Sequence, residues 1–108
     1  MTDRLLLALL GLLLGSTAMA LSPPAEMLIA QKNREFSVQE ASIAAGGRLI
    51  FSNDDDFPHQ ISASGPGVAV SSPLQCPGEM LSIPLPQAGT VQIRCGIHPR
   101  MRLTVRVD

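Results

Sequence analysis

The chain has 108 residues, a formal net charge of −1 and only three aromatic residues, all of them phenylalanine. This length gives room for one domain. The near balance of charge argues against nucleic-acid binding, which requires a basic surface, and the few aromatic rings offer no platform for stacked bases.

The first 20 residues have the layout of a cleavable secretory signal. Arg4 supplies a positive start, residues 5–14 form an apolar run, and Ala18 and Ala20 are the small residues before a cleavage site. The run is about half the ~20 residues that a membrane-spanning helix needs. We therefore predict a signal peptide over this segment, a periplasmic or otherwise secreted protein without membrane insertion after cleavage, and one mature domain over residues 21–108.

The mature region is predicted to form short β-strands, with turn-forming residues between them. No stretch of it shows helical periodicity over three turns, and short strands at this spacing predict an all-β sandwich or barrel. Pro84, inside a strand pattern, indicates an edge strand or a bulge. The predicted strands are residues 27–31, a loosely alternating segment over 36–43, then 48–52, 59–62, 68–70, 80–85, 90–95 and 103–107.

One segment between two predicted strands carries the clearest chemistry. Cys95, His98 and Met101 follow the spacing Cys-x2-His-x2-Met, so a single loop can direct a thiolate, an imidazole and a thioether to one ion. His59 supplies a second imidazole from far upstream. Two histidines, one cysteine and a weak axial methionine are the ligands of an electron-transfer copper site, whereas zinc has no use for the methionine. We predict one copper ion per chain.

With these residues, the sequence resembles the plastocyanin and amicyanin branch of the cupredoxins, the type 1 blue copper proteins. The resemblance implies a Greek-key β-sandwich (a cupredoxin-like barrel), with His59 buried and His98 at the solvent edge. It also implies that Asn53 hydrogen-bonds near the cysteine sulfur and connects the two ligand loops. The matching pieces are Asn53 and His59 with five residues between them, Pro58, and the segments 77–79, 88–90 and 95–101.

The resemblance implies a carrier of single electrons that is not an enzyme, because the sequence shows no catalytic acid, base or open metal position. We expect a monomer that docks transiently with redox proteins such as a c-type cytochrome, a dehydrogenase or an oxidase. The alternative is a copper-handling protein for storage, delivery or resistance, although the chain lacks a Met- or His-rich tail. The predicted docking and electron-entry residues are Phe57, Pro58, Ile97, Pro99 and Arg100.

The second cysteine leaves two readings open. Cys76 and Cys95 could form a disulfide in an exported protein. If residues 86–89 form a hairpin turn, however, Cys95 lies opposite Met80, and Cys76 lies beyond the ~7 Å that a disulfide can bridge. We predict a free thiol at Cys76, with intermolecular pairing as the alternative.

Three further features receive structural interpretations. Met80 is predicted to fill a gap in the core rather than to approach the copper site. Residues 54–56, three aspartates, are predicted to be turn residues rather than a patch for a partner or metal. Arg94, Arg102 and Arg106 are predicted to line a solvated face.

Overall fold

The computed structural model describes residues 22–108, which form nine β-strands and no helix. The predicted signal peptide therefore lies outside the described residues, and no helix in the described part could cross a membrane. The strands are β1 (Glu26–Lys32), β2 (Glu35–Phe36), β3 (Glu40–Ile43), β4 (Gly47–Asn53), β5 (Ile61–Gly65), β6 (Val68–Ser71), β7 (Met80–Leu85), β8 (Gly89–Cys95) and β9 (Arg102–Val107).

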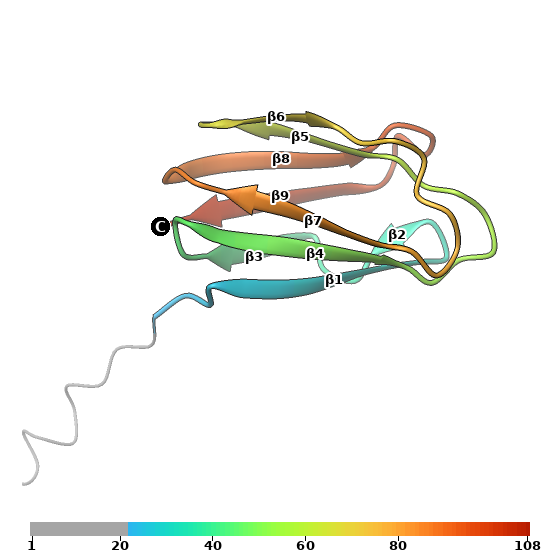
Figure 1. The fold of residues 1–108 in the computed structure, drawn as a ribbon, viewed down its shortest axis with the longest axis horizontal. Helices are drawn as coiled ribbons and strands as arrows, with labels where there is room; N and C mark the ends of the chain where they lie inside the picture. Colours follow the sequence, from blue (N-terminus) through green and yellow to red (C-terminus); the bar gives the residue numbers. More distant parts are fainter. Residues whose placement is uncertain (1–21) are drawn as a thin grey trace, which may run out of the picture.

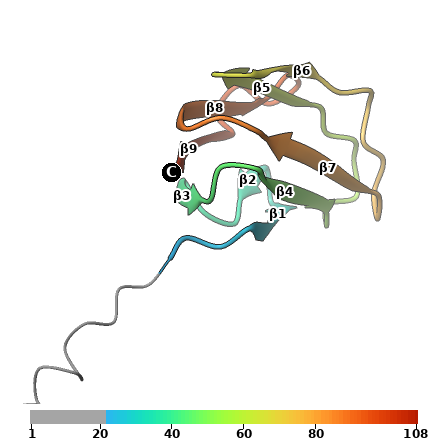
Figure 2. The ribbon, with the colours of Figure 1, turned by 60° about the vertical axis from the view of Figure 1, so that its left-hand side comes forward.

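The strands form two sheets that pack face to face (Figure 1). One sheet has the order β2-β1-β4-β7, and the other has the order β3-β9-β8-β5-β6. Both contain one parallel pair, β1 with β4 and β3 with β9, and their other pairs are antiparallel. Successive strands pass repeatedly from one sheet to the other (Figure 2). This arrangement confirms the predicted all-β Greek-key sandwich.

The core between the sheets follows from strand alternation, which sends every second side chain inward. In β8 the buried residues are Val91, Ile93 and Cys95, while the residues between them are exposed. Phe51 of β4 is fully buried, and its ring meets the ring of Phe36 edge to face with centroids 5.8 Å apart. Strand β8 ends at the predicted ligand Cys95, and it is thus anchored by the same apolar residues that hold the sheets together.

The prediction that residues 86–89 close a hairpin is wrong. β7 pairs with β4 in one sheet, whereas β8 pairs with β5 and β9 in the other. The partner of Cys95 is therefore Ile61, and the partner of Met80 is Ser52. The same turn-forming residues can close a hairpin between neighbouring strands or connect strands of opposite sheets. The sequence therefore did not distinguish these two connections.

Strand β7 confirms one prediction and overturns another. It is an edge strand, as Pro84 indicated, because proline cannot donate a backbone hydrogen bond to a further strand. Met80, predicted to fill the core, is 59% exposed. Ile83 and Leu85 point into the sandwich, and the alternation of the strand leaves Met80 on the opposite face.

We expect Phe51→Ala to lower the free energy of unfolding by about 3–5 kcal/mol, because it removes a large buried ring from the centre of the sandwich. Urea denaturation of the metal-free protein measures this loss. Leu28→Ala is the matched control on β1, where the side chain is 60% exposed, and it should change the stability by no more than about 0.5 kcal/mol. Equal losses for the two variants would contradict this description of the core.

Candidate metal centre

Three potential ligand atoms converge at one end of the sandwich. The Sγ atom of Cys95 lies 3.5 Å from Nδ1 of His59 and 3.7 Å from Nδ1 of His98. A first-row metal ion bonded to nitrogen at about 2.0 Å and to sulfur at about 2.3 Å, with angles of about 110–120°, sets these atoms about 3.5–3.7 Å apart. The three residues therefore already lie at the spacing that a shared ion requires.

Backbone pairing positions His59 before any metal is considered. Its N–H donates to the carbonyl of Gln75 over 3.0 Å, and the N–H of Gln75 donates back to the carbonyl of His59 over 2.7 Å. This isolated bridge holds the segment after β4 against the segment before β7, and His59 has no exposed surface. The structure thus places His59 in the buried position that the sequence resemblance implied.

The other candidate ligands belong to the connection between β8 and β9. Cys95 is the last residue of β8 and is buried. Two hydrogen bonds close the loop, from the N–H of Met101 to the carbonyl of His98 over 2.9 Å and from the N–H of Cys95 to the carbonyl of Met101 over 3.3 Å. Met101 is buried within the hydrophobic core, and His98 is half-buried. The donor set of imidazoles, thiol and thioether suits copper.

Gln60, which sequence reasoning missed, connects the two ligand segments. Its N–H points to Sγ of Cys95 over 3.5 Å, and its carbonyl accepts a 2.9 Å hydrogen bond from the N–H of Gly96. Its side-chain amide donates to Ser71 and to the carbonyl of Ser72. The only available signal was its place directly after His59, because these contacts are made mainly through the backbone.

Asn53 has a different role from the one implied by the resemblance. Its Nδ2 donates to the carbonyls of Phe57 and Gln75, each over 2.9 Å, and its Oδ1 accepts the N–H of Asp55 over 3.0 Å. These bonds shape the segment that leads to His59. Asn53 makes no hydrogen bond to the sulfur of Cys95 in the described part of the chain, and Gln60 takes that place.

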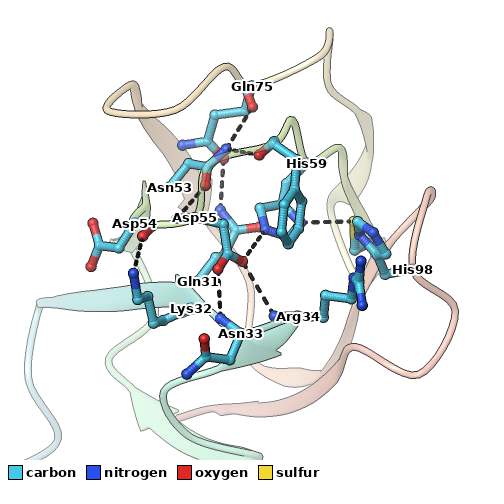
Figure 3. A network of polar contacts seen from close by, with 12 residues as sticks. Gln31, Lys32, Asn33, Arg34, Asn53, Asp54, Asp55, His59, Gln75 and His98 are labelled. Carbon is cyan, nitrogen blue, oxygen red and sulfur yellow. Dashed lines mark hydrogen bonds and ion pairs between the residues drawn. The ribbon is translucent and has the colours of Figure 1, made fainter.

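Asp55 is a second residue that sequence reasoning missed. It is buried, and its Oδ2 lies 2.7 Å from Nε2 of His59 (Figure 3). Its carboxylate also accepts the backbone N–H groups of Asn33 and Arg34. Burial alone would raise the pKa of Asp55, but the hydrogen bonds from His59 and the two N–H groups outweigh burial and lower it. The interpretation of all three neighbouring aspartates as turn residues was therefore incomplete, since only Asp54 and Asp56 are exposed.

The rim of the site is aromatic and carries a positive charge. The ring centroid of Phe57 lies 5.4 Å from that of His59 and 5.3 Å from that of His98, and the guanidinium of Arg34 lies 5.0 Å from the Phe57 centroid. Burial, followed by the electrostatic effect of the neighbouring His59 and Arg34, lowers the pKa of His98, while Asp55 opposes the shift. The uncharged imidazole that metal binding requires is thereby favoured.

The structure places the predicted docking residues around this rim. Ile97 is 43% exposed, Phe57 is half-buried, and the other three are exposed, namely Pro58, Pro99 and Arg100. All five lie within two residues of His59 or His98 in the chain, so the rim contains apolar side chains and one cation.

Neither cysteine forms a disulfide in the described part of the chain. Cys76 is thus unpaired within the chain, as predicted, although the hairpin on which that prediction relied does not exist; its intermolecular pairing stays an untested alternative. Cys76 is exposed, and the hydrogen bond to Glu79 and the negative charge of that residue raise its pKa. A raised pKa keeps the thiol protonated and weakly nucleophilic.

Several solved structures have a similar fold. The copper-containing nitrite reductase from Thermus scotoductus SA-01 matches at a TM-score of 0.69 and 26% identity, over 84% of this chain and 24% of that protein. A purple cupredoxin from Nitrosopumilus maritimus matches at a TM-score of 0.66 and 21% identity, over 76% of this chain and 99% of that one. A reduced variant of amicyanin matches at a TM-score of 0.70 and 20% identity, over 86% of this chain and 89% of that one.

The sequence matches no family model and no curated protein. This chain covers about a quarter of the nitrite reductase but most of each small cupredoxin. The chain therefore has the cupredoxin fold that the sequence resemblance predicted. Together with the group formed by His59, Cys95 and His98, this fold indicates a type 1 copper protein.

Proposed function

We propose that the chain is an extracytoplasmic type 1 copper protein that carries single electrons between redox proteins. The observation that supports this most directly is the convergence of His59, Cys95 and His98 at metal-ligand distances, next to the buried Met101. Copper bound there supplies one-electron chemistry, because soft sulfur and imidazole ligands accommodate both oxidation states. The small proteins with the same fold include a purple cupredoxin and amicyanin.

The protein fixes the candidate ligands in place without the ion, which favours fast electron transfer. His59 is fixed by its bridge to Gln75, and Cys95 is fixed by its pairing in β8. Because the ligand atoms are already close together in the protein, little rearrangement is needed when the charge of the ion changes. Burial of Cys95 and Met101 keeps water from the sulfur ligands. We propose no enzymatic activity, since the chain covers most of the small cupredoxins of the same fold but only about a quarter of the nitrite reductase.

His98 is the proposed route for the electron, because it is the only one of the four ligands with appreciable exposure. The rim beside it, Phe57, Pro58, Ile97, Pro99 and Arg100, forms the proposed docking surface. A small, partly apolar surface suits brief encounters, which redox complexes make through small interfaces. A c-type cytochrome, a dehydrogenase or an oxidase would be the partner of a monomer.

A copper-handling protein is the second candidate, because the same ligands could store or deliver the ion. Burial argues for the carrier: His59, Cys95 and Met101 are at most 2% exposed. A receiver that extracts copper by ligand exchange must reach the ligands, and only His98 can be reached directly. The chain also has two histidines in total, so it lacks a His-rich segment for passing copper on.

We expect one Cu(II) per chain and an intense visible band from charge transfer between the Cys95 thiolate and copper. Cys95→Ala should abolish the band, because it removes the thiolate. Cys76→Ala is the matched control, since this thiol is exposed and not part of the ligand group. Absorption spectra and metal analysis provide the measurement, and loss of the band in the Cys76 variant would contradict the assignment of the two cysteines.

Repeated reduction and reoxidation in the presence of a Cu(I) chelator should leave the copper content unchanged. The physical reason is that three of the four ligands are buried, so the chelator cannot replace them stepwise. Metal analysis after each cycle measures retention. Transfer of one copper per reduction to the chelator would instead support delivery and rule out the carrier.

Export generates a prediction for the segment outside the described residues. Cleavage after Ala20 should give a mature protein that begins at Leu21, because Ala18 and Ala20 are the small residues that a signal peptidase recognises. Mass spectrometry of protein recovered from the periplasm or medium measures the N-terminus. A mature chain that retains residues 5–14 would contradict this prediction.

A further inference from the structure

Asp55 is the only buried carboxylate in residues 22–108. A buried charge is strongly unfavourable unless hydrogen bonds and an opposite or polar partner compensate it. Its neighbours Asp54 and Asp56 are exposed, so water solvates their charges. Turn formation alone does not require burial of the middle carboxylate, so its surroundings must supply the compensation.

The turn between β1 and β2 supplies two of the compensating groups. Asn33 and Arg34 both have positive φ angles, 55° and 58°, a conformation that few non-glycine residues adopt. In this conformation the N–H of Asn33 donates to Oδ1 of Asp55 over 2.6 Å, and the N–H of Arg34 donates to Oδ2 over 3.2 Å. The unusual turn thus directs two backbone donors at one carboxylate.

His59 supplies the third group and links Asp55 to the metal centre. Nδ1 of His59 lies 3.5 Å from Sγ of Cys95. Nε2 of the same ring lies 2.7 Å from Oδ2 of Asp55 (Figure 3). An ionised carboxylate can only accept hydrogen bonds, so the imidazole hydrogen must be on Nε2. The lone pair is then on Nδ1 and points toward the position of the ion. Such carboxylate partners fix the ring of a ligand and raise its basicity.

We propose that Asp55 is a positioning residue that holds His59 in its metal-binding tautomer and whose charge lowers the reduction potential of the bound copper. The inference rests on the proposed copper site. A negative charge stabilises Cu(II) more than Cu(I), because Cu(II) carries one more positive charge. At this buried position salt and water screen the interaction less than at the surface. The β1–β2 turn, far from the ligands in sequence, thereby contributes to the redox properties of the site.

Voltammetry of the copper-loaded Asp55→Asn variant tests the charge. We expect the ratio of Cu(II) to Cu(I) affinity to fall about tenfold, which is a rise of about 59 mV for one electron. Asp56→Asn is the matched control, because it removes the same charge from an exposed neighbour, and it should shift the potential much less. Asp55→Glu retains the charge and should stay nearer to the wild type than Asp55→Asn. Equal shifts in the Asp55→Asn and Asp56→Asn variants would overturn the proposal.

Nitrogen-15 NMR of the wild-type Cu(I) protein tests the tautomer without a substitution, so it applies even if Asp55→Asn does not fold. We expect a proton on Nε2 of His59 that exchanges slowly with water, because the side chain has no exposed surface. An unprotonated Nε2 would overturn the proposal. If the wild type bound no copper and showed no visible band, the proposed function would fail; a blue wild type with an unshifted Asp55→Asn potential would overturn only this inference.

Discussion

The pairing of β5 with β8 is the constraint on which the metal centre depends. It places Ile61 opposite Cys95, so the segment that carries His59 enters the sheet beside the end of the strand that carries the thiol. The hydrogen bond from Gly96 to Gln60 extends this pairing by one step beyond the strands. Because backbone pairing sets the spacing between neighbouring strands, the distance between the two ligand segments follows from the sheet.

Four connections meet at the same end of the sandwich, on the right in Figure 1: the β1–β2 turn, the β4–β5 and β6–β7 segments and the ligand loop. Hydrogen bonds of polar side chains link the first three of these connections, whereas backbone hydrogen bonds and the buried Met101 hold the ligand loop. Gln75 is central, because its amide donates to the carbonyls of Phe51 and Glu79 and its Oε1 accepts from Gln31. A buried polar network with nearly every group bonded is rigid and specifies one arrangement.

This division between an apolar sandwich and a polar end explains how one small domain can combine stability with a fixed site. The core residues of both sheets secure the strands, and the polar end orients the ligands. One atom of the network, Oε1 of Gln31, has no hydrogen-bond partner in the described part of the chain. The ligand loop includes the half-buried His98, through which electrons are proposed to pass.

Sequence by itself predicted most strands of the sandwich and the candidate metal ligands. Alternation predicted β7, β8 and β9 because each has one buried face, and period-two burial is visible in consecutive residues. The spacing of Cys95, His98 and Met101 was equally visible, because one short loop holds all three. His59 was predicted as the second imidazole because it is the only other histidine of the chain, and the resemblance to a known family then implied that it is the buried one.

Only the tertiary structure decided how the strands pair and which polar residues support the ligands. The connection after β7 crosses between sheets instead of closing a hairpin, and turn residues are compatible with both. Asp55 was indistinguishable from its two neighbours, because its burial depends on the β1–β2 turn some twenty residues earlier. Gln60 acts largely through backbone atoms, which every residue shares. These roles arise from contacts between distant segments, and the physical reason that sequence could not assign them is that the contacts exist only once the sheets have formed.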